Sequence, residues 1–164
     1  MCIGDSLYPS NGSSRGFRDD LDETFGIYQM AVSDMPAEQR PLFGFGYGTD
    51  TNGLSSQTGP RGDFEAEDAV VYPYTLFAGD VFDALPAFAN VEPVQCHQPS
   101  STDADGVIQR TWHQDIDGNA HHGMLSGFVE ELRLEGTADQ IGHLYNSAEV
   151  FLQTWERTEA SRAG

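Results

Sequence analysis

The chain has 164 residues and a formal net charge of −18, from 26 acidic and 8 basic side chains. This charge argues against binding to nucleic acid, which needs clustered cations, and against binding to anionic membrane surfaces. No apolar run approaches the ~20 residues of a membrane span, and no basic start followed by an apolar stretch indicates a signal peptide.

All eight basic residues are arginine, and the chain contains no lysine. Repulsion among so many carboxylates is tolerable where salt screens it, because the Debye length is ~3 Å at molar ionic strength. We therefore expect a protein adapted to high salt, for example to a high-salt cytoplasm. A GC-rich genome that favours arginine over lysine, with acidity serving solubility, is the alternative.

The first predicted element is a helix over residues 16–34. Leu21, Phe25, Tyr28 and Val32 recur at i, i+4, i+7 and i+11, which places them on one helix face. Pro36 follows and predicts that the helix ends there.

Residues 42–54 are rich in glycine and aromatic side chains, which predicts a buried strand that other backbone approaches closely. The strand leads into Asp50 and the turn pair Asn52–Gly53. An acid at the carboxyl end of a buried strand is where α/β proteins place catalytic groups. The alternative is that Asp50 only caps the turn by accepting a backbone N–H.

A polar loop follows, in which Arg61 either holds an anionic group of a substrate or pairs with a surface acid. Residues 69–77 are prone to form a strand, but Pro73 restricts them to an edge or irregular strand. Residues 81–94 contain two prolines and predict extended or loop structure.

Two Asp-x-Asp-Gly units, at residues 103–106 and 115–118, bracket a predicted strand over 107–113. In each unit the glycine comes too early for an EF-hand and the distal glutamate is missing, so ordinary Asp-Gly turns are favoured over calcium loops. The histidines His113, His121 and His122 have no HxH or HxxxH spacing. Surface or helix-entry roles are therefore favoured over a metal site.

Two helices are predicted at the C-terminal end. The first follows Gly123 and stops at Gly136, and the second runs from 138 to about 158 with Thr137 as its cap. The second helix carries a wide apolar stripe that must pack on something. Its members are Ile141, Leu144, Tyr145, Ala148, Phe151, Leu152 and Trp155.

The order of these features resembles the C-terminal part of membrane (renal-type) dipeptidase-like metallohydrolases of the amidohydrolase superfamily. Residues 48–53, Gly-Thr-Asp-Thr-Asn-Gly, are similar to the family's GSD-x-DG motif, with Thr for Ser and Asn for the second Asp. Residues 128–136 and 146–155 are similar to its two closing helices, and residues 115–125 to an insertion of large bacterial relatives.

The resemblance implies the fold class α/β, as a C-terminal fragment of a (β/α)8 (TIM) barrel with an inserted irregular β/loop segment and two closing helices. The single incomplete domain, 1–164, would comprise a helix and the last barrel strand (16–54), the insertion (55–122) and the closing helices (123–159). Asp50 would take a proton from water on one or two zinc ions and could be a metal ligand, and Asn52 and Arg61 would bind substrate.

The metal-binding motifs of the earlier strands are absent from the chain. The resemblance therefore implies a partner, the missing N-terminal barrel portion, and a parent hydrolase that cleaves a peptide or amide bond of a small-molecule substrate. This chain alone would be inactive and would bind no zinc. The alternative function is a small acidic α+β binding or interaction module without catalysis.

Overall fold

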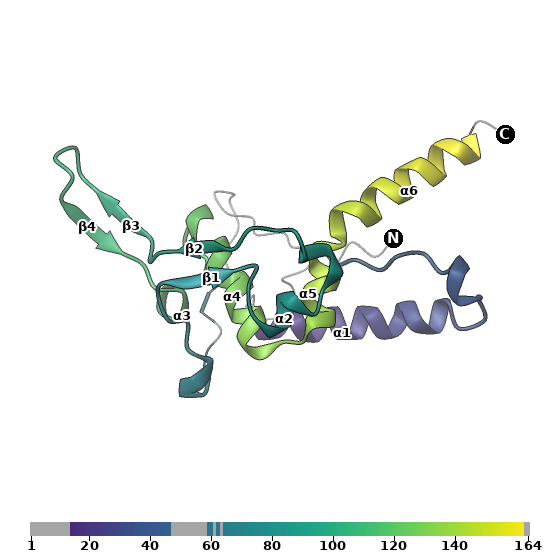
Figure 1. Cartoon of the computed structure of the whole chain (residues 1–164), viewed down its shortest axis with the longest axis horizontal. Coiled ribbons are helices and arrows are strands. Elements are labelled where there is room, and N and C mark those ends of the chain that lie inside the picture. Colours follow the sequence, from purple (N-terminus) through teal and green to yellow (C-terminus); the bar gives the residue numbers. More distant parts are fainter. Residues whose placement is uncertain (1–13, 47–58, 61, 63, 163–164) are drawn as a thin grey trace.

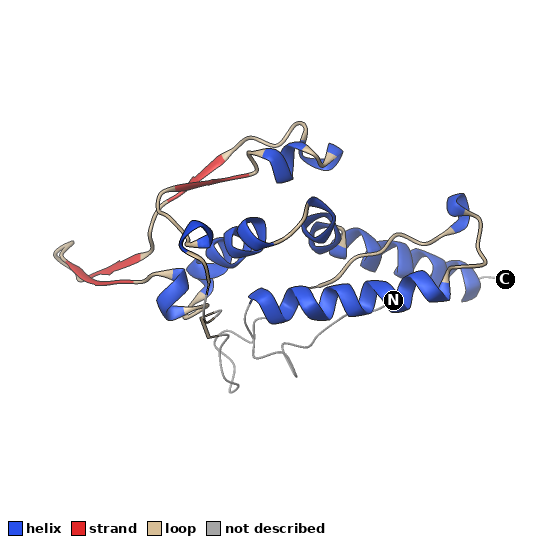
Figure 2. Cartoon of the chain, turned by 90° about the horizontal axis from the view of Figure 1, so that it is seen from below, coloured by secondary structure: helices blue, strands red, loops and turns tan. Residues whose placement is uncertain are grey.

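The computed structural model describes residues 14–46, 59–60, 62 and 64–162 of the chain. The helices are α1 (Ser14–Ala31), α2 (Asp80–Asp83), α3 (Gln114–Asp117), α4 (Leu125–Glu135), α5 (Ala138–Tyr145) and α6 (Ser147–Arg162), with single 3₁₀ turns η1 (Ala37–Gln39), η2 (Ala66–Asp68), η3 (Pro86–Phe88) and η4 (His122–Met124). The strands are β1 (Tyr74–Leu76), β2 (Val94–Cys96), β3 (Ser100–Thr102) and β4 (Ile108–Thr111). Figures 1 and 2 show both strand pairs toward one end of the molecule, with α1 and α6 extending toward the other.

Helix α1 confirms the helix predicted from the apolar spacing. Phe17 and Leu21 are buried on its inner face, and the ring of Phe17 meets those of Phe45 and Phe128 edge-on at 5.1 and 5.5 Å. The first turn of α1 also forms an ion pair with the end of α4, in which Arg15 Nη2 lies 2.8 Å from Glu135 Oε1. Helix α1 is therefore fixed against α4 by both its apolar face and its first turn.

The prediction of a strand from residue 42 is wrong for residues 42–46, which form no strand, and residues 47–54 lie outside the described part of the chain. The backbone groups that a strand ladder would use are bonded to helices instead. The N–H of Phe45 donates to the carbonyl of His143 at 2.8 Å, and the carbonyl of Phe43 accepts from Asn146 Nδ2 at 3.3 Å. The segment therefore packs into the helical core as an extended chain.

The expected close approach of other backbone to this segment is confirmed at Gly44. A Cβ atom there would lie 2.8 Å from the carbonyl carbon and oxygen of Asn146. Such contacts are shorter than Cβ atoms tolerate, so this position requires glycine.

Strands β1 and β2 form an antiparallel pair in which Tyr74 lies opposite Cys96 and Leu76 opposite Val94. This confirms a short strand after Pro73. The prediction of extended or loop structure for 81–94 is wrong in part, because α2 and η3 form there. Aromatic packing accounts for these short helices. Phe82 of α2 is fully buried, and its ring packs edge-on against those of Phe77 and Phe88 at 5.6 and 5.2 Å.

Strands β3 and β4 form a hairpin that projects from the molecule (Figure 1). The strand predicted between the two Asp-Gly units is confirmed as β4, and the first unit is the hairpin turn, with Gly106 at φ +81°. The second unit is not a simple turn. Its residues Asp115–Asp117 belong to α3, which ends at Gly118 with φ +60°.

The C-terminal half confirms α4 and the cap at Thr137, whose hydroxyl accepts from the N–H of Gln140 while the Gln140 side chain accepts from the N–H of Thr137. The single long helix predicted after it is wrong, because α5 and α6 are separate and meet at Asn146. The side chain of Asn146 binds the carbonyl of Phe43, which holds the junction against the 42–46 segment.

The described residues thus form a mixed α/β arrangement with two small antiparallel sheets and no parallel strands. The barrel fragment stays a prediction. None of the described helices is both long and apolar enough to cross a membrane.

Candidate functional site

The three residues that the sequence proposes for catalysis and substrate binding are Asp50, Asn52 and Arg61. All three lie outside the residues that the structure describes. Their roles, and the proposed role of Asp50 as a metal ligand, therefore stay predictions.

Two of the described histidines, His113 and His121, accept hydrogen bonds at helix starts. His113 Nδ1 accepts from the N–H of Asp115 at the start of α3, and His121 Nδ1 accepts from the N–H of Gly123 at the start of η4. This confirms helix-entry roles for both. Among residues 14–46, 59–60, 62 and 64–162, no three or more His, Cys, Asp or Glu side chains lie close enough together to hold a metal.

One acid of each Asp-Gly unit accepts hydrogen bonds from neighbouring groups. Asp103 Oδ1 accepts from the N–H groups of Asp105 and Val107 at 3.0 and 2.9 Å. Asp117 accepts from the N–H of His113 and from Arg110, and these contacts hold the pKa of its carboxyl below the usual value. Both carboxylates fix local backbone, Asp103 at the hairpin turn and Asp117 in α3.

A buried polar cluster joins α3 to α4. Gln114 Nε2 donates to Asn119 Oδ1 at 3.3 Å and to Glu131 Oε2 at 3.4 Å, and all three residues are buried. Gly127 makes room for the cluster, because a Cβ there would lie 2.5 Å from Gln114 Oε1. Burial raises the pKa of the adjacent Tyr72 to about 12. We assign the cluster to packing of α3 on α4.

The surface of α6 presents large apolar side chains to solvent. Phe151, Leu152 and Trp155 are 52%, 48% and 58% exposed, and no residue of α6 is buried among the described part of the chain. With Ala148 they occupy positions i, i+3, i+4 and i+7, which lie on one face of a helix. We call these four residues the α6 stripe.

The α6 stripe is the part of the predicted apolar stripe that the structure leaves uncovered. Ile141, on α5, is fully buried, so the expectation that the stripe packs on something is confirmed there. On α6 the described residues leave Phe151, Leu152 and Trp155 about half exposed, because α6 extends away from the body of the molecule after Asn146 (Figure 1), so packing of this part of the stripe stays a prediction.

A shallow groove of about 240 Å³ lies on the other side of α6, between it and α1. Its walls come from the C-terminal half of α1, from the segment 41–44 and from two residues of α6: Ile27, Tyr28, Ala31, Val32, Pro41, Leu42, Phe43, Gly44, Val150 and Thr154. The two hydroxyl groups in this wall are occupied, since Tyr28 donates to the carbonyl of Pro41 and Thr154 to that of Val150.

The groove is smaller than the ~300–1,000 Å³ of typical small-molecule sites, and its lining side chains are mostly apolar. The geometry around α6 instead suits contact with apolar groups.

No family model, no curated protein and no solved structure matches the chain. The α6 stripe is therefore the candidate functional site on the strength of its own geometry. The apolar spacing in the sequence identifies the residues of the stripe. Their exposure to solvent depends on the direction that α6 takes after Asn146, which the spacing does not predict.

Proposed function

We propose that the chain is an acidic interaction module that docks a protein partner through the α6 stripe. The observation that carries the proposal is an uncovered apolar stripe with i, i+3, i+4 and i+7 spacing on a surface helix. Amphipathic helices with these anchor positions bind apolar grooves or helix faces of other proteins. The partner is thus a protein that presents such an apolar surface.

The side chains of the stripe suit this role. Fully burying an exposed large apolar side chain contributes roughly 1.5–3 kcal/mol, and covering Phe151, Leu152 and Trp155, which are about half exposed, contributes part of that each. Aromatic residues often dominate the affinity of protein interfaces. Phe151 and Trp155 are one turn apart on the stripe. A helix of this length without buried residues is only marginally stable in isolation, so a partner would also stabilise α6 itself.

The alternative proposal is that the chain forms the C-terminal portion of a zinc-dependent hydrolase that acts on a peptide or amide bond. It depends on Asp50, Asn52 and Arg61, and no observation on the described residues supports it. Mixing the chain with the missing N-terminal portion and zinc tests it, with restored hydrolysis as the expected result. Asp50→Asn should then lower turnover by at least ~100-fold.

Docking is tested with a synthetic amphipathic helix that has leucines at i, i+3, i+4 and i+7 and glutamine on its polar face. We expect it to bind the whole chain, and we expect Leu152→Asp to weaken the binding at least ~10-fold, as measured by calorimetry. The control is Ile116→Asp, because Ile116 is 72% exposed and belongs to α3, which lies on the opposite side of the molecule from α6 (Figure 1).

Circular dichroism should show that both variants keep the helix content of the parent chain, since both side chains are exposed. Equal weakening by the two substitutions would mean that the peptide does not use the stripe. That result, or no binding at all, would end the docking proposal.

A further inference from the structure

Within the span of the α6 stripe, charged residues flank it on one edge only, and beyond Trp155 the same face continues into the ion pair of Glu159 with Arg162. At about 100° per residue, Glu149 and Glu156 lie one above the other beside Leu152, two turns apart. The opposite edge carries the neutral residues Ser147, Thr154 and Thr158. The stripe therefore has an acidic edge and a neutral edge.

The two glutamates of the acidic edge have no cation beside them. Glu149 accepts a hydrogen bond from Gln153 at 2.9 Å, and both glutamates are exposed. Among the described residues neither takes part in an ion pair, whereas Arg162 of the same helix is paired with Glu159 at 3.2 Å. Arg157 lies on the face toward the groove, away from the stripe.

A second copy of the chain is a poor occupant of the stripe. Two copies would bring together net charges of −18 each. In an isologous antiparallel pair of α6 helices, moreover, the acidic edge of one copy faces the acidic edge of the other. Like charges at such short range oppose association, and they exclude wrong partners.

We propose that the partner surface that covers the α6 stripe carries lysine or arginine side chains along the edge that faces Glu149 and Glu156. This inference rests on the proposed docking function and names the chemistry of the partner. Opposite charges placed beside an apolar contact fix the orientation of the partner and speed its association. At low ionic strength the strongly negative chain as a whole also attracts the same partner from a distance.

Three synthetic helices test the inference. They share one leucine stripe and differ only in the residues beside it, which are lysine, glutamine or glutamate. At low salt we expect the lysine helix to bind at least ~10-fold more tightly than the glutamate helix, and we expect this difference to shrink in 1 M salt. Calorimetry on the whole chain gives the dissociation constants.

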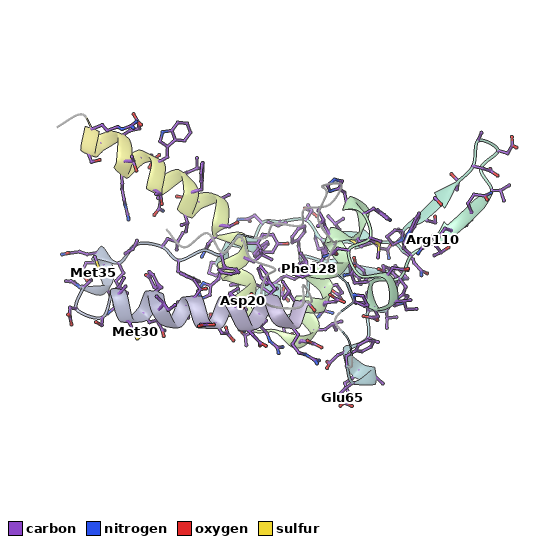
Figure 3. All side chains as sticks on the ribbon, turned by 180° about the vertical axis from the view of Figure 1, so that it is seen from behind. Asp20, Met30, Met35, Glu65, Arg110 and Phe128 are labelled. Atoms are coloured by element: carbon purple, nitrogen blue, oxygen red, sulfur yellow. The ribbon has the colours of Figure 1, made fainter. Side chains whose placement is uncertain are left out.

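The variant Glu149→Gln/Glu156→Gln separates the acidic edge from the general charge of the chain. We expect it to reduce the preference for lysine to within ~3-fold. The matched control is Glu65→Gln/Glu67→Gln, which removes the same charge from the exposed turn η2, far from α6 (Figure 3). The control should leave the preference unchanged.

Each other outcome has a definite meaning. Equal binding of all three helices overturns the inference but leaves docking through the stripe standing. A lysine preference that survives Glu149→Gln/Glu156→Gln also overturns it, because the attraction would then come from the chain as a whole. Failure of every helix to bind overturns the docking proposal itself. Self-association that Leu152→Asp abolishes, measured by sedimentation, identifies a second copy as the occupant and overturns the inference.

Discussion

At the scale of single residues, the choice of amino acid is most restricted where two backbone segments lie in contact. Gly44 lies against the carbonyl of Asn146, at the junction from which α6 departs. The sequence predicted close approach somewhere in the glycine-rich segment, but it could not say which glycine is involved. Gly46, two residues on, has nothing within 4 Å of the position that a Cβ would take.

These two glycines make a matched pair. Gly44→Ala should lower the free energy of unfolding by about 1–3 kcal/mol, because the new methyl group would overlap the backbone of Asn146. Gly46→Ala should change it by less than about 0.5 kcal/mol, as for an uncrowded site. Urea unfolding of both variants measures the difference, and equal effects would show that the 42–46 segment does not lie against the junction.

His143 gives a prediction about pH. Its ring packs against Phe25 and Phe43, with centroids 4.5 and 4.8 Å apart, and this burial lowers its pKa below 6.5 although Asp139 and Asp22 act in the opposite direction. The neutral ring is therefore favoured in the folded chain. Its contribution to stability is complete above pH 6.5 and is lost as the pH falls through the lowered folded pKa.

His143→Gln should accordingly flatten the loss of stability on acidification below pH 6.5. Chemical denaturation at a series of pH values compares it with the parent chain. His97→Gln serves as the control, because the ring of His97 is exposed. A parent chain and a His143→Gln variant with parallel pH profiles would mean that His143 is not buried as described.

At the scale of elements, the sequence predicts best what depends on neighbours along the chain. The apolar spacing predicted α1, and Gly136 with Thr137 marked the boundary between α4 and α5. The sequence is a poorer guide to structure that depends on contacts between residues far apart in the chain. Residues 42–46 look like a strand, but their backbone groups bond to His143 and Asn146, about a hundred positions away.

The capping box offers a direct test at this scale. Thr137→Ala removes the hydroxyl that accepts from the N–H of Gln140, so we expect a loss of about 1 kcal/mol in the free energy of unfolding. Thr158→Ala is the control, because Thr158 lies on the exposed face of α6 and bonds only to a carbonyl of its own helix. A loss of equal size in both variants would contradict the special role of the cap.

The candidate site illustrates the same limit. The spacing of Phe151, Leu152 and Trp155 is evident in the sequence, and it correctly predicts that they share a helix face. Their exposure follows from the break between α5 and α6 at Asn146, and no local sequence pattern predicts this break. Glu149 and Glu156 belong to no motif, and only their spacing of two turns beside the stripe marks them.

At the scale of the whole molecule, the net charge of −18 dominates. If the chain is adapted to high salt, its free energy of unfolding should rise as KCl is added from low to multimolar concentration. Most of the rise from screening should come below about 0.5 M, where the Debye length changes most. Stability that does not depend on KCl would contradict the adaptation and favour a role for the acids in solubility.

The central claim is that α6 receives a protein partner on its apolar stripe, and the emission of Trp155 reports on this directly. Trp112→Phe leaves Trp155 as the only tryptophan of the chain. Titration of this variant with the lysine-flanked helix should shift the emission to shorter wavelength and saturate, as the indole leaves water, and Leu152→Asp should abolish the shift. Emission that stays at the wavelength of an exposed indole throughout the titration, whether or not the helix binds, would contradict the claim.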